Sequence, residues 1–391
     1  MKSSEVVVVG GGPGGSAAAL MLARRGHDVT LLDRASFPRD KVCGEGLMPY
    51  GVGELRQVGI DPESLGIDAQ RFVGIGYTVG SESAVGRFPA GRYGLGVRRH
   101  RLDAALAGLC DEAGVRRLHG VKVRTVGGWP GRMWVDTSEG MFKSRALVGA
   151  DGMHSTVRKS LGLQRRPRGR PRYGLRGHFR LAAGARSLDL VEVHAADGLE
   201  FYLTPTGQRE LNVAVLLERD ATRSLKGDLE GGFRRILQTH RPLVELLDGA
   251  EPLGRPGLCG PLRQEATRVA TDGAVLVGDA AGFLDGITGE GMSLSLLSAR
   301  IAAEVVSGAL QRGDLTRRAL QPYASRRWRA SRDLTWLTEI VLAGIRFRPL
   351  ARRVVRGLRR HPDVFEQVMA VNAGLGGIRD VGVRNLAKVL L

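Results

Sequence analysis

Residues 10–15, which read Gly-Gly-Gly-Pro-Gly-Gly, constrain this chain more than any other feature of its sequence. They follow a β-branched run at residues 5–9 and precede an alanine- and leucine-rich stretch at residues 16–25, so the predicted order is strand, tight turn and helix. Gly26 ends the helix, and residues 29–32 resume a strand. The sequence therefore predicts one complete β-α-β unit at this end of the chain.

The glycine spacing matches the GxGxxG pattern of dinucleotide-binding sites, in the strand-to-helix context that gives the pattern its meaning. Gly10 permits the tight turn, Gly12 lets the backbone approach a pyrophosphate, and Gly15 lets the helix pack closely on the strand. The phosphates would then lie at the positive end of the helix dipole. Asp33 ends the second strand and would accept hydrogen bonds from a ribose. The predicted nucleotide-binding set also includes Pro13, Gly14 and Arg34.

Two later segments place an aspartate and a glycine directly after a strand-like run: residues 149–158 (GADGMHSTVR) and residues 278–282 (GDAAG). Together with the glycine turn, they resemble the three fingerprints of the FAD-dependent oxidoreductases that include the geranylgeranyl reductases and the aromatic-ring hydroxylases, which are flavin monooxygenases. The resemblance implies that Asp279, with Gly278 before it, binds the ribityl and phosphate region of FAD. It also implies that Asp151 lies near the cofactor and the route of the nicotinamide.

Two further segments are predicted to contact the flavin. Residues 286–292 (GITGEGM) begin a long predicted helix, and the free N–H groups at its start would favour negative charge on a reduced flavin. Arg99 begins another predicted helix and occupies the place of an arginine that the resembling enzymes use against the cofactor. A solvated charge at a helix start is the alternative for Arg99. The first of these segments adds Gly289, Gly291 and Met292 to the predicted cofactor-binding residues.

Between residues 167 and 268 the pattern changes to short alternating runs separated by turn residues, which is typical of an antiparallel sheet. The predicted fold is α/β: a Rossmann-like FAD-binding domain with an inserted antiparallel-sheet substrate domain and a C-terminal helical region. We expect the FAD-binding domain to span residues 1–166, with a small substrate-side segment near 70–98, and to resume at residues 269–312. The substrate domain would occupy residues 167–268, and a basic helical region residues 313–391.

The loop at residues 37–49 (FPRDKVCGEGLMP) is predicted to belong to the active site. It is similar to the Cys-Gly loop of geranylgeranyl and menaquinone reductases and, more distantly, to a loop of flavin-dependent halogenases. Cys43 could donate a proton near the flavin, although a free cysteine is more often a small buried hydrophobic residue. Glu45 and Tyr202 are the other candidate catalytic residues. No metal site is predicted, because the three cysteines lack paired spacing.

Two departures from the resembling families bear on the reaction. No lysine occurs between Lys41 and Lys122, whereas the halogenases carry one after this loop, so halogenation is disfavoured. The prenyl reductases carry a Tyr-x-Trp-x-Phe-Pro element, of which residues 200–205 (EFYLTP) keep only the central aromatic and the proline. These features favour an NAD(P)H-fuelled flavin monooxygenase that hydroxylates an aromatic or polyketide-like ring. Reduction of double bonds in prenyl or quinone side chains is the alternative. NAD(P)H would visit transiently, because no second nucleotide-binding unit follows the first.

The chain is strongly basic, with a formal net charge of +18, which raises the question of a polyanionic partner. Thirteen arginines lie between residues 317 and 360, against only Asp333 and Glu339. No aromatic-rich RNA-binding signature accompanies them, so nucleic acid is not expected as a partner. A non-catalytic basic binding protein is therefore the least favoured hypothesis, beside a flavoenzyme that takes a hydrophobic small molecule.

The C-terminal region leaves two interpretations open. Residues 334–347 are apolar but too short to span a bilayer. Further on, Leu350, Val354 and Leu358 share one face of a predicted helix, and arginines occupy the remainder. Such a helix can lie on an anionic membrane, or it can pack on the protein with its arginines outside. Because the cysteine usage fits a reducing compartment, we expect a cytoplasmic protein, with a peripheral place at the inner face of the membrane as one outcome.

Overall fold

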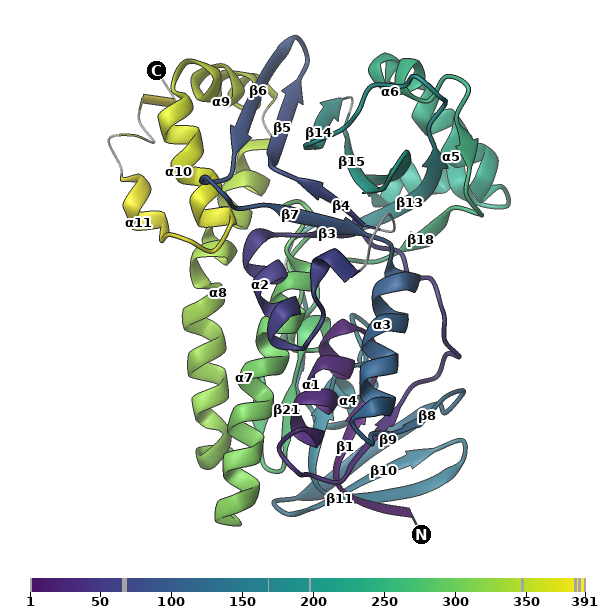
Figure 1. Cartoon of the computed structure of the whole chain (residues 1–391), viewed down its shortest axis with the longest axis vertical. Helices are drawn as coiled ribbons and strands as arrows, with labels where there is room; N and C mark the ends of the chain where they lie inside the picture. The colour runs from purple at the N-terminus through teal and green to yellow at the C-terminus, as the bar shows by residue number, and fades with distance from the viewer. Residues whose placement is uncertain are drawn as a thin grey trace.

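The computed structural model describes residues 2–64, 69–167, 169–196, 198–345, 348–382, 385 and 388–389. Two large sheets are stacked along the long axis of the molecule, and C-terminal helices run beside both (Figure 1). The lower, mainly parallel sheet has the order β20-β21-β11-β1-β2-β8, and β10 and β9 continue from β11. Its strands are β1 (Lys2–Val9), β2 (Val29–Leu32), β8 (Arg116–Leu118), β9 (Val123–Trp129), β10 (Arg132–Thr137), β11 (Gly140–Gly149), β20 (Ala270–Thr271) and β21 (Ala274–Leu276).

The parallel register brings the three sequence motifs to one edge of this sheet. Val9 at the end of β1 lies opposite Leu32 of β2 and Gly149 of β11, and Gly149 in turn lies opposite Leu276 of β21. Because all four strands run in the same direction, the residues that follow them meet at their carboxyl ends. The glycine turn, Asp33, the 149–158 segment and the 278–282 segment are therefore neighbours, although they are far apart in sequence.

The upper sheet is mainly antiparallel and has the order β17-β13-β16-β15-β14-β5-β6, with β18 beside β13. Strands β5 and β6 of this sheet come from the 70–98 segment, and β5 pairs in parallel with β14. The strands are β5 (Gly74–Val79), β6 (Glu82–Arg87), β13 (Arg172–Arg180), β14 (Val191–Ala196), β15 (Leu199–Gly207), β16 (Glu210–Glu218), β17 (Glu251–Pro252) and β18 (Gly257–Cys259). Smaller sheets join the two parts: β3 (Gly46–Leu47), β4 (Ala69–Phe72) and β7 (Gly94–Val97), and β12 (Gln164–Arg165) with β19 (Glu265–Ala266).

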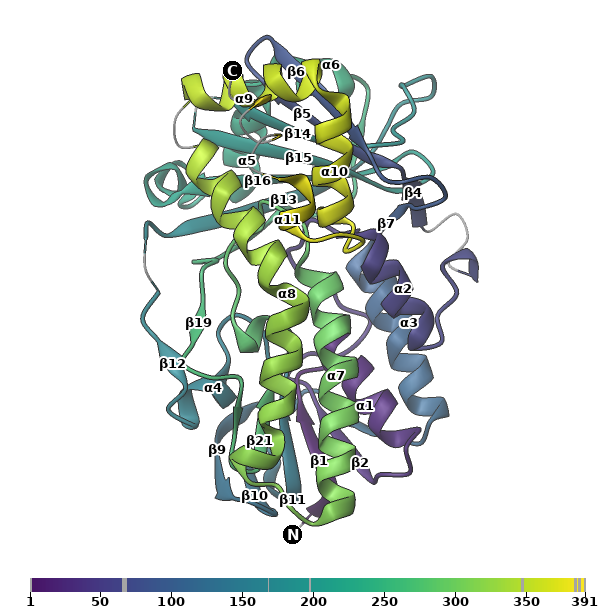
Figure 2. The same ribbon diagram turned by 90° about the vertical axis from the view of Figure 1, so that its left-hand side faces the viewer.

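The helices pack around these sheets, and the long α8 lies in front of α7 when the molecule is turned by 90° (Figure 2). Short 3₁₀ helices also lie at Arg219–Leu225 and Gly278–Ala281. The α-helices are α1 (Pro13–Ala23), α2 (Pro49–Gln57), α3 (Arg99–Glu112), α4 (Thr156–Ser160), α5 (Leu229–Gln238), α6 (Arg241–Leu246), α7 (Gly291–Arg312), α8 (Arg317–Ile345), α9 (Arg348–Arg360), α10 (Pro362–Asn372) and α11 (Ile378–Val381).

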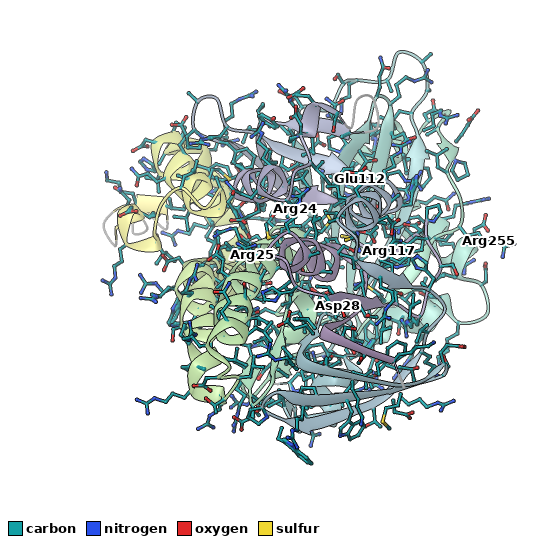
Figure 3. The ribbon with its side chains drawn as sticks, turned by 60° about the horizontal axis from the view of Figure 1, so that its bottom comes forward. Arg24, Arg25, Asp28, Glu112, Arg117 and Arg255 are labelled. Carbon is teal, nitrogen blue, oxygen red and sulfur yellow. The ribbon has the colours of Figure 1, made fainter. Side chains whose placement is uncertain are left out.

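Charged side chains of both signs cover the lower end of the molecule (Figure 3). Around the ends of α1 and α3, for example, Arg24 and Arg117 lie on the same side as Asp28 and Glu112. In contrast to this mixed surface, α8 and α9 carry much of the positive excess of the sequence.

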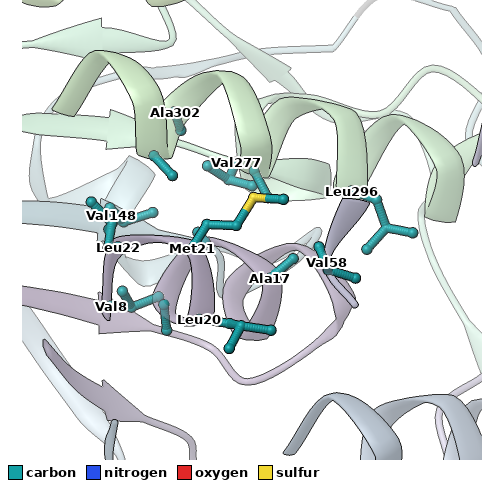
Figure 4. Close-up of a cluster of buried hydrophobic side chains, with 14 of the residues drawn as sticks. Val8, Ala17, Leu20, Met21, Leu22, Val58, Val148, Val277, Leu296 and Ala302 are labelled. Carbon is teal, nitrogen blue, oxygen red and sulfur yellow. The ribbon is translucent and has the colours of Figure 1, made fainter. Parts of the chain in front are cut away.

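The core of the lower part is built on α1 and α7. Every residue of α1 from Pro13 to Leu22 is buried, as expected for a helix that is apolar on all sides. Figure 4 shows Met21 of α1 pointing toward the helix that carries Leu296 and Ala302. Among the described residues, α7 is the one helix long and apolar enough to cross a membrane, but 67% of its apolar window is buried against the protein. This burial is typical of a helix in the core of the protein.

The C-terminal helices pack on the upper sheet. Ala351 and Val355 of α9 are buried, and Leu358 packs with them against β5 and β6. The apolar face expected from the sequence is therefore covered by protein, with the arginines outside, and Leu350 at its start stays exposed. Residues 346 and 347, at the end of the predicted apolar stretch, lie outside the described residues.

Substitution of Gly15 in α1 tests how closely this helix approaches β1, and Gly108 in α3 is the control position. A Cβ at Gly15 would lie 1.7 Å from the carbonyl oxygen of Gly10, so we expect Gly15→Ala to lower the free energy of unfolding by about 3 kcal/mol or more. Gly108 is exposed inside α3, and a Cβ there meets nothing within 4 Å, so Gly108→Ala should raise that free energy by about 1 kcal/mol. Urea unfolding measures both, and equal effects would contradict the packing argument.

Candidate functional site

The glycine turn is closed on one side and open on the other. Gly10 has φ +102°, and a Cβ there would lie 2.4 Å from the carbonyl oxygen of Ala150. A Cβ at Gly12 would instead meet only the guanidinium ends of Arg39 and Arg99, both at 3.6 Å. No side chain caps the start of α1. The first N–H groups of α1 are therefore available to an anion that approaches along the open side of the turn.

Asp33 fixes the turn against β2. Its Oδ2 accepts a hydrogen bond from the N–H of Gly11 at 2.6 Å, and its Oδ1 accepts one from the N–H of Ala35 at 2.7 Å. Each carboxylate oxygen keeps a further lone pair for a hydroxyl group. Arg34 is exposed and does not line the cleft described below.

Asp279 and Asp151 have different tasks. Asp279 lines the cleft, with the Nζ of Lys41 3.6 Å from its Oδ2. Asp151 is turned away: its carboxylate accepts hydrogen bonds from the N–H groups of Thr156 and Val157, at 2.6 and 3.1 Å, and caps α4. Burial raises the pKa of Asp151. The side chain of Asp151 thus shapes its own loop, whereas its neighbour Gly152 lines the cleft.

Arg158 is a residue whose role the sequence did not reveal, although it ends the 149–158 motif. It is fully buried, and its Nη1 donates to the carbonyl oxygens of Asp279 and Ala280 at 3.2 and 2.9 Å. Its Nε donates to Gln164. Burial lowers the pKa of Arg158, against the opposing charges of Asp151 and Asp279. Arg158 therefore ties the second motif to the third.

Arg99 is buried rather than solvated, so the interpretation of Arg99 as a solvated charge is wrong. Only 3% of its surface is exposed, it lines the cleft, and it forms a two-point ion pair with Asp103 at 2.8 and 3.0 Å. Burial alone would lower the pKa of Arg99, but the charge and hydrogen bonds of Asp103, together with the contribution of Cys43, outweigh it and raise the pKa. Arg99 is a permanent cation beside the open side of Gly12.

The Cys-Gly loop is held by a buried carboxylate. Glu45 has φ +59°, is fully buried, and accepts hydrogen bonds from the N–H of Arg99 at 2.8 Å, from Asn212 Nδ2 at 2.8 Å and from His178 Nε2 at 2.6 Å. Asn212 also donates to the carbonyl oxygen of Cys43 at 2.9 Å. Cys43 is partly exposed and lines the cleft. Glu45 therefore positions the loop that carries Cys43.

The proton on His178 can be assigned from its neighbours. Arg176 can only donate, and its Nη1 lies 2.9 Å from Nδ1 of His178, so Nδ1 accepts and Nε2 carries the proton donated to Glu45. Arg176 in turn binds both oxygens of Asp40. Burial disfavours the ionised form of Glu45, but the hydrogen bonds from His178 and from the N–H of Arg99, with the positive charge of Arg176, outweigh it and lower the pKa of Glu45.

A continuous cleft of about 1280 Å³, part of it open to solvent, runs from the glycine turn into the antiparallel sheet. One end is lined by backbone of the three motifs and by Gly289, Gly291 and Met292 at the start of α7. The other end is mostly apolar. Its walls include Leu175, Val191, Tyr202, Ala214, Leu216, Leu262 and Phe283.

Tyr202 borders a buried polar network that the sequence did not indicate. Its hydroxyl donates to Glu200 at 3.0 Å, Glu200 accepts from Arg172 at 2.6 Å, and Arg172 lies 3.3 Å from Asp285. Burial and the Glu200 charge raise the pKa of Tyr202, so its phenol stays protonated. Burial raises the pKa of Asp285 to about 6.

Comparison with known proteins identifies the family. A family model described as an FAD binding domain matches residues 3–337. The chain belongs to this family of FAD-dependent oxidoreductases. It is 31% identical over 309 residues to the menaquinone reductase of Mycobacterium tuberculosis, which covers 73% of this chain and 72% of that protein.

A second relative supports this family assignment, and a solved structure shares the fold. Digeranylgeranylglycerophospholipid reductase 2 of Methanopyrus kandleri is 28% identical over 334 residues, covering 78% and 77% of the two chains. A flavoprotein/dehydrogenase from Cytophaga hutchinsonii superimposes with a TM-score of 0.85 at 20% identity, covering 100% of this chain and 99% of that one. The last match shows a shared fold.

The residues of this oxidoreductase fit FAD. The open side of Gly12 and the uncapped start of α1 suit the pyrophosphate, and Asp33 suits the adenosine ribose. Asp279 and the start of α7 line the same cleft, where they would hold the ribityl chain and the flavin ring. The described part of the chain contains no group of His, Cys, Asp and Glu side chains that could hold a metal ion.

Gly12→Ala separates cofactor binding from folding. The new Cβ would point into the cleft at an ordinary φ of −73°, so we expect the free energy of unfolding to stay within about 1 kcal/mol of the parent protein. FAD affinity should fall at least roughly tenfold, because the Cβ occupies the pyrophosphate approach. Visible absorption after gel filtration measures the bound flavin. A folded variant that remains yellow would contradict this placement.

Asn212→Asp tests the Glu45 network through its pH dependence. The depressed pKa of Glu45 means that its stabilising contribution is present above its unfolded pKa and is lost as the pH falls through its folded pKa. In the variant, two carboxylates face each other, so we expect a loss of about 3 kcal/mol at pH 7. The loss should shrink toward pH 5, because one carboxyl then takes up a proton.

The control for Asn212→Asp is Asn385→Asp. The side-chain amide of Asn385 donates a hydrogen bond to Gln367 outside the cleft. Thermal unfolding of both variants between pH 5 and pH 8 measures the difference. A loss for Asn212→Asp that does not depend on pH would show that Glu45 is not ionised.

Proposed function

We propose that this FAD-dependent oxidoreductase reduces a carbon–carbon double bond in the prenyl chain of a lipophilic substrate. The observation that carries the proposal is the continuity of the cleft, which joins the flavin end to a largely apolar chamber. A chamber walled by Leu175, Leu216 and Phe283 offers an extended hydrocarbon chain an apolar environment, and few polar side chains to an oxygen-rich ring.

Residues 200–205, which keep only part of the prenyl-reductase element, also support this proposal because two of them line the cleft. Residues at 200, 202 and 204 alternate on one face of β15, and both Tyr202 and Thr204 line the cleft. Phe201 and Leu203 point to the opposite face, into the core under α5. The segment that departs from the family pattern in sequence therefore still contributes one aromatic side chain to the wall of the cleft.

The relatives that align over most of the chain point the same way. Their names describe reduction of menaquinone and of digeranylgeranylglycerophospholipid, and both compounds carry prenyl chains. The loop with Cys43 lies at the junction between the flavin end and the apolar end of the cleft. This placement suits a group that acts on a double bond held against the flavin.

The chemistry divides between cofactor and protein. Reduced FAD, when bound, would supply a hydride to one carbon of the double bond, and the other carbon would take a proton. The protein holds the substrate chain between the walls of the cleft and excludes water from it. Cys43 is the titratable side chain that the Glu45 network orients toward this junction, and we propose it as the proton donor. NAD(P)H would restore the reduced cofactor from the surface.

Anaerobic turnover distinguishes double-bond reduction from oxygen insertion. The enzyme is reduced with dithionite without oxygen and mixed with a prenylated quinone or a geranylgeranyl lipid, and products are analysed by mass spectrometry. We expect one double bond of the prenyl chain to gain two hydrogens, which in heavy water appear as two carbon-bound deuterium atoms because the hydride of a reduced flavin exchanges with solvent. A product that forms only in air and carries an isotopically labelled oxygen atom would replace the proposal with ring hydroxylation.

Narrowing the apolar end should affect long substrates selectively. Ala214 lies in the wall of the cleft, so Ala214→Phe should raise KM for a long prenyl chain by roughly tenfold, the effect of losing the contacts of about two buried methylene groups. The flavin spectrum should not change, because Ala214 lies away from the three motifs. Ala183→Phe, at an exposed position, is the matched control. Equal kinetic effects would show that the chamber does not hold the substrate.

A further inference from the structure

The outer face of α8 leaves large apolar side chains exposed. Trp328, Trp336 and Ile340 are 56%, 59% and 49% exposed. Their spacing places them along one side of the helix, over a length of about 18 Å. On the opposite side, Leu337 and Thr338 are buried. Figure 2 views the molecule from the side on which α8 lies at the front. We call Trp328, Trp336 and Ile340 the α8 stripe.

Positive charge surrounds the α8 stripe. Arg329 and Arg332 are exposed on the same part of the helix. The two acids of α8 are both close to arginines: Asp333 lies 3.5 Å from Arg332, and Glu339 pairs with Arg263 at 2.9 Å. The negative charges of this helix are therefore compensated, and its outer face is cationic.

The next helix adds a second cationic region, at the upper end of α8 (Figures 1 and 2). The apolar side of α9 is already packed on β5 and β6, so this helix offers charge, while the α8 stripe offers apolar surface. A depression in the surface there is lined by Arg352, Arg353, Arg356, Arg360, His361 and Lys388.

We infer that the α8 stripe and the arginines of α8 and α9 form a docking surface for an anionic lipid bilayer. Tryptophan favours the boundary between headgroups and acyl chains, and arginine is attracted to lipid phosphates. A second copy of this chain on the same surface would bring like charges together. A polynucleotide would satisfy the arginines but would give the stripe no apolar environment. The bilayer is the partner that matches both chemistries.

The docking surface lies close to the apolar end of the cleft. On the inner side of α8, Thr338 Oγ1 lies 3.1 Å from Thr288 Oγ1, and the nearby Gly286 lines the cleft, where a Cβ would lie 3.4 Å from Leu216 of the apolar wall. Docking would therefore bring the chamber within the thickness of one helix of the lipid. The inference goes beyond the proposed reaction, and binding can be measured without substrate or turnover.

Vesicle binding of the full-length flavoprotein tests the surface. Phosphatidylcholine vesicles, with or without phosphatidylglycerol, are sedimented with the protein at low and high salt. We expect binding only to the anionic vesicles, and weaker binding at high salt. Arg329→Gln and Arg332→Gln should each weaken binding roughly fivefold. The matched control is the pair Arg223→Gln and Arg234→Gln, whose side chains are 78% and 70% exposed elsewhere.

Insertion of the α8 stripe into the bilayer can be measured separately, by the quenching of tryptophan fluorescence. Phospholipid brominated on its acyl chains should quench tryptophan fluorescence in the parent protein, and Trp328→Phe with Trp336→Phe should remove that quenching. Trp129→Phe, 63% exposed in the β9–β10 hairpin, should retain it. All variants should keep the flavin spectrum and thermal unfolding of the parent protein.

Three results would overturn the inference. They are equal binding to neutral and anionic vesicles, equal loss of binding in the Arg329 and Arg332 variants and in the Arg223 and Arg234 controls, and absence of tryptophan quenching in the parent protein. Self-association that the stripe variants abolish, without vesicle binding by the parent protein, would assign the face to a second copy instead.

Discussion

The Cβ that Gly15 lacks would lie 1.7 Å from the carbonyl oxygen of Gly10, so α1 can begin only where two glycines let it approach the strand. That contact sets the start of α1 at the carboxyl edge of the parallel sheet. Because β2, β11 and β21 end at the same edge, Asp33 and the second and third motifs are positioned relative to the same helix start. The cofactor groove follows from this close approach.

Buried charge then fixes the loops that a parallel sheet leaves irregular. Arg158, without exposed surface, connects the second motif to the carbonyl oxygens of the third. Removing an ionic group from water is costly unless hydrogen bonds compensate it, and Arg158 has partners on both of its terminal nitrogens and on Nε. Glu45 does the same for the Cys-Gly loop, which it ties to both the start of α3 and the antiparallel sheet. Loops held by buried hydrogen bonds therefore wall the cleft on both sides of the junction.

The two ends of the cleft have different chemistry because different sheets build them. The parallel sheet contributes backbone N–H groups and aspartates, which suit phosphate and sugar. The antiparallel sheet contributes one face of alternating apolar side chains, which suits a hydrocarbon chain. The outer surface of α8 and α9 also combines positive charge with apolar side chains. This surface lies next to the apolar end of the cleft.

The sequence alone determined the β-α-β unit, the glycine turn, the antiparallel character of the middle segment and the family, because each rests on local spacing or on the period of buried residues. It also predicted that Gly12, Asp279 and Cys43 lie near the cofactor, and all three line the cleft. Only the tertiary structure decided that Asp151 caps α4, that Arg99 is buried, and that Glu45 meets His178 and Asn212, which are 133 and 167 residues away. It also decided which face of α9 is covered. The physical reason is that the partner of a polar or apolar side chain is chosen by strand register and helix packing between distant segments, which no local pattern encodes.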